Sequence, residues 1–195
     1  MLLCSACVLC DRPGAVVCAR CGVALGRAPS LALPLGIDSC CALFDYDAAR
    51  GLITALKNGG RRDLVGWLAA GLAERVDVPP GAVVTWAPTG TARRHGRGFD
   101  QAELLARALA RRRGLRCVAL LRRAPGPAQA GRSRNERRMS PAFFPRRGCP
   151  PCVLVVDDVA TTGATLTAAA RALRAGGTGV VLAAVAARSA GRRSA

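Results

Sequence analysis

Two adjacent carboxylates and a cluster of hydroxyl residues occur together between residues 153 and 166. Asp157 and Asp158 follow four apolar, mostly β-branched residues, and a short stretch with three threonines and a glycine separates them from an Ala/Leu-rich segment. Hydroxyl groups and the backbone N–H groups at a helix start donate hydrogen bonds to phosphate oxygens. Carboxylates repel phosphate but accept hydrogen bonds from vicinal hydroxyls, such as those of a ribose. These residue types therefore predict a sugar-phosphate site.

A strand and a helix must position these groups. Residues 153–156 have the pattern of a buried strand, and residues 165–175 have helical spacing that ends at two glycines. Gly163, in the turn between them, lets the backbone approach an anion. An ordinary strand–turn–helix connection, with Asp158 or Thr161 as the N-cap, is the simpler alternative. The combination of two acids, three threonines and a glycine favours the ligand site.

Strand and helix patterns alternate through the rest of the chain. The expected strands are 37–46, 82–87, 115–121 and 179–187, and the expected helices are 47–57, 63–76 and 99–113. This order predicts an α/β domain over residues 37–187, with a parallel sheet and helices on both faces. Ligands of such sheets bind at the carboxyl ends of the strands. The strand that precedes Asp157 must end at that edge.

Two arginine-rich loops are further candidates for anion binding. The first contains Arg93, Arg94 and Arg97 and follows the strand expected at 82–87. The second, residues 122–147, has many arginines and little periodic apolarity. This pattern favours a mobile hood that covers the active site, rather than plain disorder. Lys57, at the end of an expected helix, is either a solvated residue or reaches a diphosphate.

Cysteine pairs near the N-terminus predict a metal site. Two C-x-x-C pairs supply four thiolates, which suit a closed, tetrahedral, structural zinc site better than disulfides in a chain without an export signal. The expected ligands are Cys4, Cys7, Cys18 and Cys21. Cys7 and Cys10 are an alternative first pair, and buried unliganded thiols are the simpler interpretation. Residues 1–27 therefore form a zinc-ribbon-like unit that we expect to depend on the metal to fold.

The composition is that of a basic globular protein. Apolar residues make up 51% of the chain, and 29 basic residues against 12 acidic ones leave a net charge of +17. This excess favours anionic partners, phosphates or nucleic acid. No apolar run reaches membrane-spanning length and the N-terminus does not have the pattern of a signal peptide, which predicts a cytoplasmic protein. Residues 28–36 have the composition of a linker, and 188–195 that of a disordered basic tail.

The segment DDVATTGAT, at 157–165, resembles the phosphoribosyl-diphosphate (PRPP) motif of the type I phosphoribosyltransferases. Over nearly its whole length the chain resembles the ComF/GntX family of that superfamily. The cysteine pairs, ALKNGGRRDL at 55–64 and RRHGRGFDQAELLA at 93–106 carry this closer resemblance. The chain departs from the family at Asp100, where asparagine is usual, and at 86–89, where the strand end is usually richer in proline.

The resemblance implies a type I phosphoribosyltransferase fold with a small N-terminal zinc ribbon. It also implies a glycosyltransferase that acts on PRPP, or binds another ribose phosphate, with magnesium. Asp157 and Asp158 would be the catalytic residues and hold the ribose hydroxyls, and the hood over 122–147 would choose the acceptor. The 5′-phosphate would be held by Ala160, Thr161, Thr162, Gly163, Ala164 and Thr165. The diphosphate would be neutralised by Lys57, Arg93, Arg94 and Arg97.

The resemblance further implies a process, competence and DNA uptake, or else nucleotide metabolism. A protein of another class is the competing hypothesis: a non-catalytic module on the same fold that binds single-stranded DNA and a DNA-uptake helicase. Sixteen arginines against three acids between residues 93 and 147 support this alternative. The scarcity of aromatic residues among them weakens it, because single-strand binding normally uses base stacking.

Overall fold

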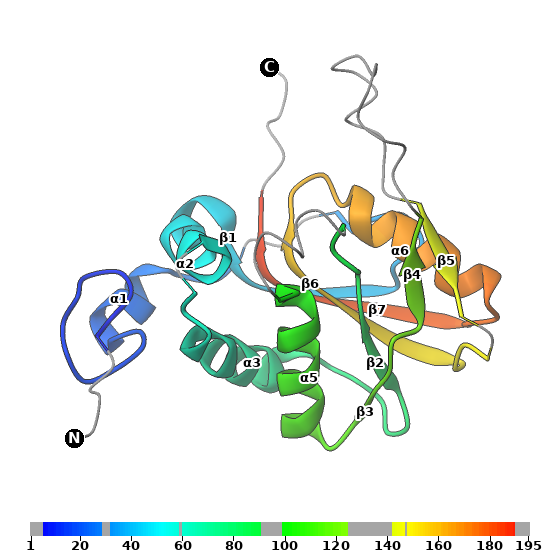
Figure 1. The fold of residues 1–195 in the computed structure, drawn as a ribbon, viewed down its shortest axis with the longest axis horizontal. Coiled ribbons are helices and arrows are strands. Elements are labelled where there is room, and N and C mark those ends of the chain that lie inside the picture. The colour runs from blue at the N-terminus through cyan, green and yellow to red at the C-terminus, as the bar shows by residue number, and fades with distance from the viewer. Residues whose placement is uncertain are drawn as a thin grey trace, which may run out of the picture.

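A parallel sheet of five strands forms the centre of the molecule. The computed structural model describes residues 6–28, 32–58, 60–90, 99–124, 142–146 and 148–189. The strand order is β1-β7-β6-β2-β3, and every neighbouring pair is parallel (Figure 1). The strands are β1 (Ser39–Asp45), β7 (Val180–Arg188), β6 (Cys152–Ala160), β2 (Val83–Trp86) and β3 (Arg116–Cys117). The α/β class and the parallel sheet predicted from the sequence are thus confirmed.

Helices cover both faces of the sheet and divide the apolar core into two layers. One layer contains α2 (Tyr46–Asn58), α3 (Asp63–Arg75) and α5 (Gln101–Arg113), and the other contains α6 (Ala164–Ala175) (Figure 1). The alternation of side chains along β6 supplies both layers. Leu154 and Val156 join the first layer, and Val153 and Val155 join the second. A central strand buried on both faces explains the continuous apolar run before the acidic pair.

The chain leaves the two central strands in opposite directions. From β2 it passes through α5 to β3 at one edge of the sheet, and from β6 it passes through α6 to β7 on the other side. The carboxyl ends of β2 and β6 therefore border the point at which the strand order reverses. Open α/β sheets bind their ligands in the crevice at this point.

The strand β6 is longer than the sequence pattern indicates. We expected a strand that ends at residue 156, whereas β6 continues through Asp157 and Asp158 to Ala160. Its pairing with β7 continues over this stretch, with Asp157 opposite Val185 and Ala160 opposite Arg188. Its pairing with β2 ends at Val156. Both acids thus lie on the part of β6 that pairs with β7 but no longer with β2.

A small antiparallel sheet takes the place of part of the expected loop. The single strand expected at 115–121 is wrong, because the chain forms β3 and then β4 (Leu121–Arg123). β4 pairs with β5 (Phe143–Pro145), and Leu121 and Phe143 are buried in the same layer as α6. The two ends of the predicted hood are therefore strands. Its middle, residues 125–141, lies outside the described residues.

The N-terminal unit packs directly on α2 and α3. It contains the short helix α1 (Ala19–Ala24), and its Val17 and Leu25 belong to the same buried cluster as Leu52 and Leu68. Arg61 binds it as well, because its Nη2 donates to the carbonyl oxygen of Ala6 at 2.8 Å. The unit is thus an extension of the main core. None of the helices in the described parts of the chain is long and apolar enough to cross a membrane.

Candidate functional site

A polar pocket of about 250 Å³ lies in the crevice between β2 and β6. Its walls come from both ends of α2, from the segment after β2, from the carboxyl end of β6, from the start of α6 and from β4. The side chains that matter chemically are Tyr46, Lys57, Thr89, Arg123, Asp157, Asp158, Thr161 and Thr165. The pocket brings together both predicted acids, two of the predicted threonines and the one lysine of the sequence.

Lys57 and Asp158 form an ion pair inside the pocket. The distance from Lys57 Nζ to Asp158 Oδ2 is 2.9 Å, and the side chains are 27% and 16% exposed. Lys57 comes from the last turn of α2, whose Leu52 and Leu56 are buried in the core. The ammonium group of Lys57 therefore faces the pocket and an acid, and its contact with a diphosphate stays a prediction.

Asp157 is held in an environment that disfavours its charge. Burial raises the pKa of Asp157 well above its usual range, and the neighbouring charge of Asp158 raises it further. One hydrogen bond acts in the opposite direction, since Asp157 Oδ1 accepts from the backbone N–H of Asp158 at 2.8 Å. Two acids with one lysine between them make a site that favours an additional cation or hydrogen-bond donor.

The turn after β6 contains a glycine in the left-handed conformation. Gly163 has φ +74°, and a Cβ there would lie 3.0 Å from Cγ of Pro34. It is the N-cap of α6, and Thr162 Oγ1 accepts from the N–H of Ala164 at 3.3 Å. Thr161 and Thr165 line the pocket. Glycine is required here both by the left-handed backbone and by the close approach of Pro34.

The opposite wall is fixed by Asp100. This side chain is only 5% exposed and caps α5 by accepting from the N–H groups of Ala102 and Glu103. It also accepts from the N–H of Thr89 at 2.8 Å and from the hydroxyl of Thr89 at 3.2 Å. One carboxylate thus ties the loop after β2 to the helix that follows. Asp100 thus supplies four hydrogen bonds to a loop and a helix start.

Sequence reasoning did not single out Tyr46, Thr89 or Arg123 as site residues. Tyr46 follows β1 directly and Thr89 follows β2, so the rule that ligands bind at strand ends could have selected both. Arg123 was one of many arginines in the expected hood. Its guanidinium donates to the carbonyl oxygen of Pro88 at 3.3 Å and lies 5.9 Å from the ring centre of Phe143. The pairing of β4 with β5, which sets Arg123 opposite Phe143, explains the position of Arg123.

Several predicted site residues fall outside the part of the chain that the structure describes. The candidate diphosphate ligands Arg93, Arg94 and Arg97 are among them, as is Cys4. Within the described residues, Ala160 is buried at the end of β6 and Ala164 is the first residue of α6. The predicted 5′-phosphate segment therefore covers the strand end, the turn and the helix start.

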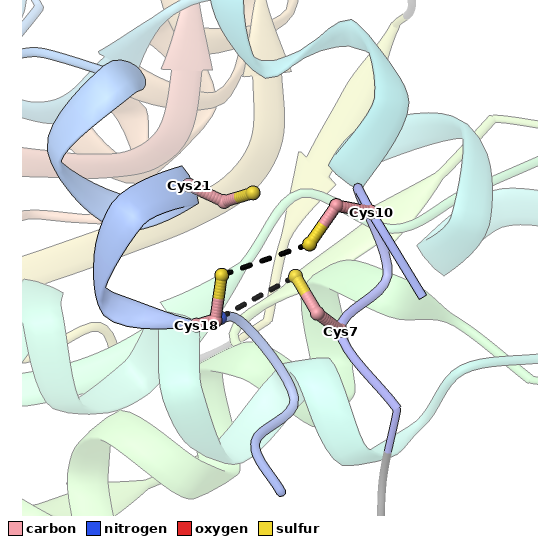
Figure 2. A group of neighbouring side chains, drawn as sticks. All are labelled: Cys7, Cys10, Cys18 and Cys21. Atoms are coloured by element: carbon pink, nitrogen blue, oxygen red, sulfur yellow. Dashed lines mark hydrogen bonds between the residues drawn. The ribbon is translucent and has the colours of Figure 1, made fainter. Parts of the chain in front are cut away.

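Four cysteines converge in the N-terminal unit (Figure 2). The sulfurs of Cys7, Cys10, Cys18 and Cys21 all lie within 4.8 Å of one another, and those of Cys10 and Cys18 are 3.7 Å apart. Four thiolates around one zinc ion place their sulfurs about 3.8 Å from each other. The ligand set matches the alternative pairing, with Cys10 in the position first expected for Cys4.

The surroundings of these thiols favour the thiolate at one corner of the cluster. The backbone N–H of Cys18 donates to Cys7 Sγ at 3.4 Å, and this contact is the main reason why the pKa of Cys7 falls to about 6. The pKa of Cys18 is also lowered, whereas the other sulfurs raise that of Cys21. A cation bound among four sulfurs removes this mutual repulsion. The donor set therefore fits a structural zinc ion.

No family model matches this chain, and no curated protein matches it.

Proposed function

We propose that the protein is a ComF-like member of the type I phosphoribosyltransferase superfamily that binds PRPP with magnesium in the pocket between β2 and β6. One observation carries the proposal: the adjacent acids Asp157 and Asp158 share a polar pocket with Thr161 and Thr165 at the crevice where the strand order reverses. The parallel sheet and the cysteine unit agree with the resemblance of the sequence to this family.

Each wall of the pocket has a part of the substrate to hold. Asp157 and Asp158 accept hydrogen bonds from the ribose hydroxyls. The turn from Thr161 to Thr165 donates hydroxyl and backbone N–H groups to the 5′-phosphate at the start of α6. Lys57 neutralises diphosphate. Displacement at the anomeric carbon then depends mainly on positioning and on stabilising the departing diphosphate.

The acidic pair fits magnesium by the chemistry of its donors. Carboxylate oxygens are hard ligands of the kind Mg²⁺ selects, and magnesium sites commonly combine one or two carboxylates with substrate phosphates. When bound, magnesium would neutralise the charge of the diphosphate. Asp157 and Asp158 are the described residues that would hold it.

Thermal unfolding tests the binding claim. PRPP with Mg²⁺, at about 100 times its Kd, should raise the melting temperature by roughly 5–10 °C. The double variant Asp157→Ala/Asp158→Ala should lose this shift, whereas Asp77→Ala should keep it, because Asp77 is an exposed acid on the segment before β2. An unchanged wild-type melting curve would overturn the proposal.

Catalysis needs a separate measurement. A screen of nucleobases and amines for diphosphate release from PRPP should reveal one acceptor that gives turnover, and the double aspartate variant should abolish it. Binding of PRPP without release of diphosphate for any acceptor would leave a PRPP-binding protein that is not a transferase.

A second function, binding of single-stranded DNA, is favoured by one observation. Phe144 is 49% exposed, and the guanidinium of Arg122 lies 5.7 Å from its ring centre. This pair offers a base-stacking surface beside a cation. DNA affinity should then fall steeply with salt, decrease in Phe144→Ala, and survive Asp157→Ala/Asp158→Ala. Affinity that is lost in the double aspartate variant would contradict a separate DNA surface.

A further inference from the structure

The pocket contains an internal counter-cation. Lys57 is the one lysine among 29 basic residues, and its Nζ is 2.9 Å from Asp158 Oδ2. Both side chains are largely withdrawn from solvent, with 27% and 16% of their surface exposed. An ion pair of this kind is less screened by salt than one on the open surface.

Two carboxyl groups share the pocket with this one lysine. Asp157 and Asp158 are consecutive, and Lys57 pairs with Asp158. Arg123 also lines the pocket, but its guanidinium donates to the carbonyl of Pro88 and lies over Phe143. Lys57 is therefore the cation in contact with the acidic pair among the described residues.

Lys57 combines a fixed backbone with a flexible side chain that can exchange one anionic partner for another. Ala49, Leu52 and Leu56 anchor α2 in the core, so the helix that carries Lys57 is held in place. The ammonium group, by contrast, ends a flexible four-carbon stem and is a compact charge without the planar, two-pronged geometry of arginine. It can leave one carboxylate oxygen for a phosphate oxygen in the same pocket without a movement of the helix.

We propose that Lys57 is a displaceable counter-cation of Asp158. In the ligand-free protein Lys57 occupies Asp158 and competes with divalent cations for the acidic pair. A phosphorylated substrate offers Lys57 new oxygens, so that the acids become available to the cation that accompanies the substrate. This inference rests on the proposed function, because it assigns an order of events to the same site.

Binding of Mn²⁺ alone, followed by electron paramagnetic resonance, tests the competition without any turnover. Wild-type protein should bind Mn²⁺ weakly at this site. Lys57→Gln should bind it about tenfold more tightly, since a competing ion pair has been removed. Lys57→Arg should bind Mn²⁺ as weakly as the wild type. Lys57→Gln/Asp158→Asn should lose the gain.

A matched variant separates the local effect from a change in net charge. Arg50 is exposed on the same helix, and Arg50→Gln removes one positive charge outside the pocket. It should leave the affinity for Mn²⁺ unchanged. An equal gain in Arg50→Gln and Lys57→Gln would overturn the proposal, because the effect would then be one of net charge.

Calorimetric titration with PRPP and Mg²⁺ distinguishes failure of this inference from failure of the proposed function. Weaker PRPP binding in Lys57→Gln supports the exchange of partners. If the wild type binds PRPP but Lys57→Gln binds Mn²⁺ no more tightly than the wild type, the counter-cation role of Lys57 is overturned and the proposed function is not. Wild-type protein that does not bind PRPP overturns the function and, with it, the exchange of Lys57 onto substrate. If Lys57→Gln does not fold, Lys57→Met keeps the apolar stem and gives the same comparison.

Discussion

Asp157 combines a position in the polar pocket with a cost to stability. Because burial raises its folded-state pKa above the ordinary value of about 3.9, the folded state holds its proton at pH values where the unfolded state has lost it. The free energy of unfolding should therefore decrease as the pH rises from the unfolded pKa through the folded pKa. Each unit of difference between the two pKa values corresponds to about 1.4 kcal/mol.

Asp157→Asn should consequently stabilise the ligand-free protein at neutral pH, because the amide carries no charge to desolvate. The gain relative to wild type should grow as the pH rises above 4, and binding of PRPP should be lost. Urea unfolding between pH 4 and pH 8 measures the first effect. A gain in stability that is independent of pH would show that the pKa of Asp157 is not raised.

Gly163 should be intolerant of a side chain for two reasons. Gly163→Ala places a residue with a Cβ at φ +74° and brings that Cβ to 3.0 Å from Pro34, which together should cost about 1–3 kcal/mol. Gly114→Ala is the matched control, since Gly114 has φ +64° but nothing within 4 Å of a Cβ. If chemical denaturation shows that both variants lose the same free energy of unfolding, Pro34 does not crowd this turn.

At the scale of elements, Asp100 links the loop after β2 to α5. Asp100→Asn should cost about 1 kcal/mol, because the amide oxygen can keep the cap but the amide nitrogen cannot accept from the N–H of Thr89. Asp100→Ala should cost roughly 2 kcal/mol, since it removes the cap as well. Thermal unfolding of the two variants makes the comparison. An equal loss in both variants would contradict the capping role.

The cysteine unit offers a sharp choice between two ligand sets. Zinc analysis of Cys4→Ser should find about one ion per chain, whereas Cys10→Ser should lose the metal, because the sulfur of Cys10 converges with those of Cys7, Cys18 and Cys21 to complete a set of four. Loss of zinc should also lower the melting temperature of the main domain, since Val17 and Leu25 share its core. Retention of zinc by Cys10→Ser with loss in Cys4→Ser would reverse the assignment.

Elements with a strong local signal could be predicted from the sequence, and those fixed by distant pairing could not. The buried run 153–156 and the helix ended by Gly176 carry their own patterns. The extension of β6 to Ala160 depends instead on β7, and the split of the expected strand at 115–121 depends on β5. The choice of Cys10 over Cys4 was left open, because both pairs have the same spacing.

On the scale of the whole molecule, the sheet explains why residues far apart in the sequence form one site. The order β1-β7-β6-β2-β3 brings the end of β2 beside Asp157, and α2 brings Lys57 to Asp158. That the acids and threonines would share one pocket was predictable from their spacing between a strand and a helix. The partnership of Lys57 with Asp158 was not, because it depends on the packing of α2 against the sheet.

Calorimetric titration of the zinc-loaded protein with PRPP and Mg²⁺ tests the central claim most directly. Ribose 5-phosphate and diphosphate are titrated separately as the two halves of the ligand. PRPP should bind with one site per chain and more tightly than either half, because the acids, the turn at 161–165 and Lys57 then act on one molecule. The absence of saturable PRPP binding, or equal affinity in Asp157→Ala/Asp158→Ala, would contradict the account.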